Sequence, residues 1–154
     1  VGSCFWFRIP CYEVQSGAEV MVAREPETLP TLQILLVEDS PVNQQVIQAM
    51  LRKLGHQVTL ASNGREAVAA VAATNPHLVL MDLRMPEMDG LEATRRIKQN
   101  HPELPIVALT ANASEEDRNA CRQAGMSELV SKPVTSKRLH MALFDVMGKK
   151  NGQL

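Results

Sequence analysis

The sequence predicts an α/β fold built on a doubly wound, five-stranded parallel sheet. Short apolar runs typical of buried strands alternate with helical patterns from about residue 32 to residue 148. The connections between these segments are short, and right-handed crossovers then place helices on both faces of the sheet. Polar residues follow several of the apolar runs, at the strand ends where ligands bind in open α/β sheets. These observations favour a flavodoxin-like (βα)5 topology with the strand order 2-1-3-4-5.

The first predicted strand is the apolar run 33–37, and a helix follows it. Ser40 is a favourable N-cap, and Pro41 is a favourable first helical residue. Gly55 is typical of the residue that ends a helix. The helix face that we expect to point inward consists of Val42, Val46, Ala49, Met50 and Leu54.

The later segments continue this alternation. We expect the remaining strands at residues 57–60, 77–82, 105–109 and 128–131. We expect the remaining helices at residues 63–73, 91–99, 114–125 and 135–147. Ser114 and Asp117 form a capping-box pair, and Thr135 is suited to cap the last helix. The tail after this helix has no pattern, so we expect it to be frayed.

The first thirty residues differ from the rest of the chain in composition. Four of the five aromatic residues lie in the first dozen positions: Phe5, Trp6, Phe7 and Tyr12. Residues 1–13 show the period-two alternation of a strand, whereas the Pro- and Glu-containing stretch 14–31 is typical of a linker. We therefore expect the end of a preceding domain at 1–13, a linker at 14–31, one folded domain at 32–148 and a tail at 149–154.

The composition argues against several classes of protein. A chain of 154 residues, 45% of them hydrophobic, is long enough for one domain with a full core. The net charge of −1 argues against nucleic-acid binding, which normally requires a basic excess. No apolar run is long enough to span a bilayer, so we expect a cytoplasmic domain without direct membrane contact. The three cysteines lack metal-binding spacing, which fits a reducing compartment.

The polar residues at four strand ends indicate a reaction site. Glu38 and Asp39 follow the first strand, Asp82 ends the third, Thr110 ends the fourth and Lys132 follows the fifth. In the predicted topology they converge on one cleft at the switch point of the sheet. Three carboxylates beside one ammonium leave excess negative charge, which Mg²⁺ would relieve because it prefers oxygen ligands. Asp82 beside such an ion is suited to be an acyl-phosphate nucleophile, with Lys132 and Thr110 binding phosphoryl oxygens.

Four motifs resemble those of the receiver domain of two-component response regulators. They are Val37-Glu-Asp39, Met81-Asp-Leu-Arg-Met-Pro-Glu-Met-Asp-Gly90, Leu109-Thr-Ala111 and Ser131-Lys-Pro133, and the similarity covers about residues 32–147. The resemblance implies that Asp82 accepts a phosphoryl group from a phosphohistidine. It implies that Mg²⁺ is held by Glu38, Asp39, Asp82 and the backbone carbonyl of Arg84. It also implies that Thr110 moves toward the phosphoryl group and that Lys132 pairs with it.

The N-terminal region extends this resemblance. Residues 1–10 are similar to the last strand of a histidine-kinase ATP-binding domain, and residues 40–43 resemble receivers within hybrid sensor kinases. The resemblance implies a parent hybrid sensor histidine kinase, a phosphotransferase anchored in the inner membrane. Its implied partners are a histidine-kinase or histidine-phosphotransfer domain, and another receiver or sensor kinase. Because no Gly-rich phosphate loop is present, we expect this chain to catalyse only phosphorylation and dephosphorylation of its own Asp82.

One position departs from the receiver pattern. The family commonly has an aromatic residue three positions before the lysine of the last strand, and that residue swings inward on phosphorylation. This chain has Leu129 there, which indicates either an altered output switch or plain core packing. An alternative function therefore stays open: a receiver-shaped interaction module that binds a kinase or another receiver without phosphorylation. A phosphatase of the haloacid dehalogenase type is set aside, because it needs an aspartate where Arg84 lies.

The histidines and the loop methionines show no pattern that indicates a function. His56 and His77 each precede a predicted strand, and the other two lie in a turn and in the last helix. We expect surface or packing roles for all four histidines. The methionines at positions 81, 85 and 88 are expected to fill the core and the loop after Asp82.

Overall fold

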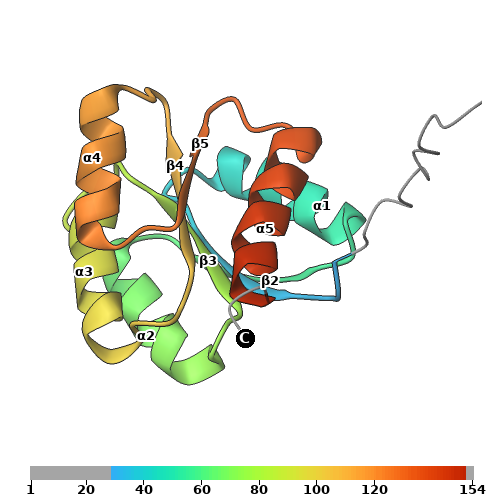
Figure 1. Ribbon diagram of the computed structural model, residues 1–154, viewed down its shortest axis with the longest axis horizontal. Coiled ribbons are helices and arrows are strands. Elements are labelled where there is room, and N and C mark those ends of the chain that lie inside the picture. The colour runs from blue at the N-terminus through green and yellow to red at the C-terminus, as the bar shows by residue number, and fades with distance from the viewer. Residues whose placement is uncertain (1–28, 152–154) are drawn as a thin grey trace, which may run out of the picture.

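The computed structural model describes residues 29–151, which form one parallel sheet with helices on both faces (Figure 1). The strands are β1 (Gln33–Val37), β2 (Gln57–Ala61), β3 (Leu78–Asp82), β4 (Ile106–Thr110) and β5 (Glu128–Ser131). The helices are α1 (Pro41–Lys53), α2 (Gly64–Thr74), α3 (Gly90–Asn100), α4 (Glu115–Ala124) and α5 (Ser136–Asn151). The sheet order is β2-β1-β3-β4-β5, so the predicted fold class and topology are confirmed. The strand predicted at 1–13 lies outside the described residues, as does nearly all of the predicted linker.

The helices form two layers around the sheet (Figure 1). α1 and α5 cover one face, where Leu51 and Leu143 join a core cluster with residues of the inner strands. α2, α3 and α4 cover the other face, where Ile97 and Cys121 belong to a second cluster. β3 and β4 are buried along their whole length, because both of their faces are covered in this way.

The register of the sheet brings the strand ends to one edge. Val37 of β1 pairs with Met81 of β3, one residue before Asp82. Asp82 pairs with Leu109 of β4, and Thr110 pairs with Ser131 of β5. The residues that end β3 and β4, and those that follow β1 and β5, therefore lie along the carboxyl edge of the sheet.

Side-chain caps fix where the helices begin. The N-caps Ser40, Asn63, Asp89 and Ser114 each accept a hydrogen bond from the backbone N–H three residues later. Ser40 and Ser114 agree with the caps predicted from the sequence, and Asn63 agrees with the predicted start of the second helix, whereas Asp89 was not identified. The methionines at 81, 85 and 88 are all buried, as expected.

Two predictions about the helices are wrong. The face of α1 that packs on the sheet contains Ile47 and Leu51, and of the predicted face Met50 packs against the same cluster. Val42 and Val46, by contrast, are 69% and 48% exposed. Apolar residues cover a wide arc of this helix, so the pattern was compatible with more than one inward face, and contact with the sheet selects one of them. The last helix also continues to Asn151 rather than ending near Met147, and so includes the first residues of the predicted tail.

Candidate functional site

The candidate site lies at the carboxyl edge of the inner strands. Glu38 and Asp39 follow β1 directly, Asp82 is the last residue of β3, and Lys132 follows β5. One ligand atom each from Glu38, Asp39 and Asp82 lies within 4.8 Å of the others. Glu38 and Asp82 are buried, at 1% and 4% exposure, whereas Asp39 is exposed. The structure thus brings together the three predicted carboxylates, and two of them are removed from water.

Lys132 supplies the charge that allows these carboxylates to be buried. Its Nζ lies 2.8 Å from Oε2 of Glu38 and 3.2 Å from Oδ2 of Asp82. Burial alone lowers the pKa of Lys132, but hydrogen bonds and charges from Glu38 and Asp82 outweigh that effect and raise the pKa above its ordinary value. The ammonium group is therefore charged at neutral pH. It leaves the three carboxylates with two uncompensated negative charges.

Backbone and amide groups at the start of α1 hold Glu38 in place. Its Oε1 accepts hydrogen bonds from the backbone N–H of Ser40 at 3.2 Å and from the side-chain amide of Asn43 at 3.5 Å. The side-chain amide of Gln44 donates to the backbone carbonyl of Glu38 at 2.6 Å. The sequence analysis did not assign these roles to Asn43 or Gln44. The available signal was the position of both amides within one helical turn after the acidic pair.

The loop after β3 positions Asp82 from the other side. The backbone N–H of Arg84 donates to Oδ1 of Asp82 at 3.1 Å. The N–H of Gly90 donates to the carbonyl of Leu83 at 3.1 Å, which folds the loop back onto the strand end. A side chain at position 90 would collide with the carbonyl oxygen of Asp82, so only glycine fits there. The predicted role of the Arg84 carbonyl stays a prediction, because the contact that the structure gives Arg84 here comes from its N–H.

Thr110 lies at the same edge but bonds in another direction. It is 2% exposed, and its hydroxyl donates to the carbonyl of Asn112 at 2.8 Å and accepts from the N–H of Asn112 at 3.2 Å. These bonds tie the end of β4 to the loop that leads into α4. Thr110 is therefore next to the acidic cluster in the sheet without a hydrogen bond to it.

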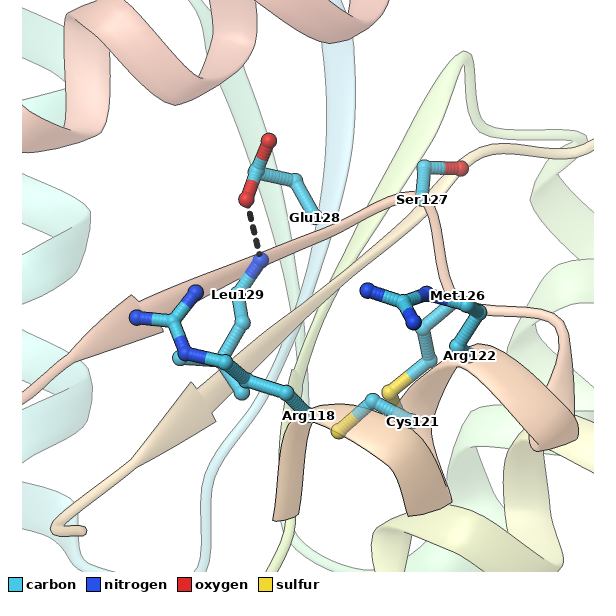
Figure 2. Close-up of a pocket in the computed structure, with 7 residues that line it drawn as sticks. All are labelled: Arg118, Cys121, Arg122, Met126, Ser127, Glu128 and Leu129. Atoms are coloured by element: carbon cyan, nitrogen blue, oxygen red, sulfur yellow. Dashed lines mark hydrogen bonds between the residues drawn. The ribbon is translucent and has the colours of Figure 1, made fainter. Parts of the chain in front are cut away.

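Leu129 lines a pocket of about 170 Å³ between α4 and β5 (Figure 2). Cys121 and Met126 contribute sulfur atoms to this pocket, and Arg118 and Arg122 extend from α4 along it. The backbone N–H of Leu129 donates to Oε1 of the neighbouring Glu128 at 3.0 Å. The side chain of Leu129 is partly buried and packs against the core cluster under α4. Core packing is thus one role of Leu129, and the hollow beside it is not filled by an aromatic ring.

The fold and this edge first define a class of protein. It is a (βα)5 domain with a cleft of three carboxylates and a lysine at the switch point of its sheet. The chain belongs to the response regulator receiver domain family, whose profile matches residues 34–144. Members of this family act in two-component phosphorelays, and this chain is a receiver domain.

Individual relatives agree with this assignment. The sensor histidine kinase RcsC of Salmonella typhi is 35% identical over 138 residues, which cover 86% of this chain and 15% of that kinase. The receiver domain of sensor histidine kinase PA1611 from Pseudomonas aeruginosa PAO1, solved with magnesium coordinated in its active site cleft, is 46% identical with a TM-score of 0.71. That match covers 77% of this chain and 99% of that domain. The chemotaxis protein CheY4 of Vibrio cholerae is 27% identical, with a TM-score of 0.73 over 76% of this chain and 99% of that one.

The chain spans about 15% of the length of the RcsC kinases it resembles. Among residues 29–151, no helix combines the length and the apolar character needed to cross a membrane.

Proposed function

We propose that Asp82 accepts a phosphoryl group from a phosphohistidine in a Mg²⁺-dependent reaction. The observation that carries this proposal is the burial of Asp82 beside Lys132 within a group of three carboxylates. A carboxylate oxygen of Asp82 forms a bond to phosphorus while the P–N bond of the donor breaks. The released imidazole nitrogen keeps the electron pair and takes up a proton. Water later attacks the aspartyl phosphate, which returns the carboxylate and inorganic phosphate.

The residues present fit a magnesium ion. Their donor atoms are all oxygens, they converge within 4.8 Å, and they carry two more negative charges than Lys132 compensates. Glu38, Asp39 and Asp82 would hold the ion, with the backbone carbonyl of Arg84 as the fourth protein ligand. When bound, Mg²⁺ supplies positive charge beside the phosphoryl oxygens and reduces their repulsion of the Asp82 carboxylate. The magnesium in the cleft of the PA1611 receiver supports this assignment.

Lys132 and Thr110 would bind the transferred group. Lys132 already contacts Oδ2 of Asp82, so its ammonium lies where a phosphoryl oxygen would arrive. For the Thr110 hydroxyl to reach the same group, it must leave Asn112, and the loop before α4 would then move. We therefore expect phosphorylation to change amide exchange in residues 111–124. Identical exchange with and without a phosphoryl mimic would contradict this switching role.

The partner is expected to approach over the start of α1. Val42 and Val46 are exposed one turn apart on this helix, which begins two residues after Asp39. Such exposed apolar residues beside a charged cleft fit a docking surface for a protein that carries the phosphohistidine. A histidine-kinase or histidine-phosphotransfer domain would supply this partner, with another receiver or sensor kinase as a second class.

The hybrid-kinase origin of the chain is part of the proposal. The RcsC and EvgS sensor kinases among its relatives are longer than this chain, which supports a parent hybrid kinase. In that parent, residues 1–13 would end the ATP-binding domain and residues 14–31 would link it to a receiver at 32–148. The receiver would then lie on the cytoplasmic side of an inner membrane that anchors the parent.

The test is the intact mass of the protein after incubation with acetyl phosphate and Mg²⁺. We expect a gain of one phosphoryl group in the natural chain and in Asp89→Asn, which keeps an N-capping side chain on α3. We expect no gain in Asp82→Asn or in the presence of EDTA. If the folded natural chain binds Mg²⁺ and gains no mass with either acetyl phosphate or its histidine donor, the phosphorylation-independent interaction module becomes the better description.

A further inference from the structure

Histidine side chains hold the backbone where the chain enters the sheet, at the edge opposite the carboxylates. The N–H of Leu32 donates to Nδ1 of His56 at 3.2 Å. The N–H of Gln33, the next residue, donates to Nδ1 of His77 at 3.0 Å. His56 precedes β2 and His77 precedes β3, so one imidazole comes from the start of each of the two strands that flank β1. Two consecutive amides at the start of β1 thus depend on imidazole acceptors.

The hydrogen bonds define the protonation state of both rings. An imidazole nitrogen accepts a hydrogen bond only when it carries no proton, so Nδ1 is unprotonated in His56 and in His77. The proton of each neutral ring is then on Nε2. A second proton would go to Nδ1 and would set an N–H donor against the N–H of Leu32 or Gln33. Protonation of either histidine therefore removes the acceptor for one backbone amide.

A third histidine, His140, affects the pKa of His56, which is the buried one of the two. His56 is 5% exposed, and its Nε2 has no hydrogen-bond partner among the described residues. The same holds for the buried Nδ1 of His140, on α5. Burial, and then the charge of His140, lower the pKa of His56. A metal ion on Nε2 of His56 would require the proton on Nδ1, against the N–H of Leu32, so the hydrogen bonds argue against a metal site.

The other charged groups near these rings form no ion pairs with them in the described part of the chain. The ion pairs of residues 29–151 include none of the three histidines. Arg52 and Lys53, at the end of α1 before His56, are exposed, and Asp145 shares a surface hollow with His140. The hollow beside Gln33 at the same edge is lined by uncharged residues of β1 and β2, of the end of α2 and of the turn before His77. No carboxylate thus pairs with a protonated His56 or His77 within the described part of the chain.

We propose that His56 and His77 form a pH-sensitive latch on the segment through which the chain enters this domain. At neutral pH both imidazoles are acceptors, and they fix Leu32 and Gln33 at the start of β1. The side chain of Leu32 is 3% exposed within the core under α1 and α5, and Leu29 packs against the same cluster. Acidification removes the two acceptors and frees this segment, while the carboxyl edge of the sheet is left intact. The latch does not depend on phosphorylation of Asp82.

The test is residue-resolved amide hydrogen exchange at pH 7.5 and pH 5.5, corrected for intrinsic exchange rates. The reference is the N–H of Val79, which donates to the carbonyl of Pro105 at the same edge. We expect the protection of Gln33, relative to Val79, to fall about tenfold on acidification, the loss of one hydrogen bond. Leu32 should lose less protection at pH 5.5, because burial and then the charge of His140 lower the pKa of its acceptor, His56. Equal protection ratios at the two pH values would overturn the proposal.

Asparagine variants separate the latch from general acid sensitivity. Asn places an oxygen acceptor near the position of Nδ1 and does not titrate. In His56→Asn/His77→Asn, we expect the protection ratio to be the same at both pH values. If the buried substitution prevents folding, the exposed His77→Asn alone should make Gln33 insensitive to pH while Leu32 keeps its response. A tenfold fall at Gln33 in that variant would also contradict the latch.

Discussion

The two edges of the sheet bury polar groups in different ways. At the carboxyl edge, Glu38 and Asp82 share the ammonium of Lys132, so the buried charges compensate one another. At the opposite edge, where the strands begin, His56 and His77 are acceptors for backbone amides, and one nitrogen of His56 has no partner within the described part of the chain. The first arrangement has excess negative charge and suits a cation and a phosphoryl group. The second is neutral and responds to protons. One sheet can therefore support a reaction site and a separate structural response.

The largest expected effect comes from breaking the charge pairing. Lys132→Met leaves Glu38 and Asp82 buried without their shared cation. We expect the free energy of unfolding without metal to fall by about 3 kcal/mol, measured by urea denaturation. Mg²⁺ should recover part of this loss, because it supplies a replacement cation. The control Lys137→Met, at an exposed position of α5, should leave the stability unchanged, and a similar loss in both variants would contradict the pairing.

A smaller loss is expected from the loop that holds Asp82. In Gly90→Ala, the new methyl group meets the carbonyl oxygen of Asp82, and we expect a loss of about 2 kcal/mol. Gly148 in α5 has no atom within 4 Å of such a methyl group. Gly148→Ala should therefore stabilise the protein by about 0.5 kcal/mol, as alanine does within helices. If both variants changed the free energy of unfolding in the same direction, the contact of position 90 with the Asp82 carbonyl would not be the reason that glycine is needed there.

The two edges should lose stability at opposite ends of the pH scale. The pKa of His56 is lowered in the folded state, so its neutral form stabilises the protein above the ordinary value of 6.5, and this contribution is lost as the pH falls below that value. The pKa of Lys132 is raised, so its contribution is present below 10.5 and is lost as the pH rises above that value. The urea concentration at the midpoint of unfolding should therefore fall at both the acidic and the alkaline end of this pH range. His56→Asn should reduce only the fall at acidic pH, and Lys132→Met only the fall at alkaline pH.

The smallest effect on stability is expected for Asp39, the exposed one of the three carboxylates. Asp39→Asn removes a negative charge that forms no ion pair among residues 29–151, so without metal we expect a gain of about 0.5 kcal/mol. The same change should weaken Mg²⁺ binding about tenfold, as measured by calorimetric titration. Asp89→Asn is the matched control and should change neither quantity. Unaltered Mg²⁺ affinity in Asp39→Asn would remove Asp39 from the set of ligands.

The carboxyl edge could be predicted from sequence because its signals are local. Each functional side chain comes directly at the end of an apolar run, and the alternation of strands and helices determines which edge they share. The inward face of α1 could not be predicted, since apolar residues cover a wide arc of that helix and only contact with the sheet selects Ile47 and Leu51. The histidine latch was missed for a related reason. His56 and His77 gain their role from backbone amides 24 and 44 residues away, which no local pattern contains.

The most direct test of the central claim is to locate the phosphoryl group after reaction with a small P–N donor. Phosphoramidate has the bond type of a phosphohistidine, and tandem mass spectrometry of the reacted protein identifies the modified residue. With Mg²⁺ present, we predict a single aspartyl phosphate at Asp82, and none in Asp82→Asn. A phosphoryl group on another residue, or equal labelling of the natural chain and Asp82→Asn, would contradict the assignment of Asp82 as the acceptor.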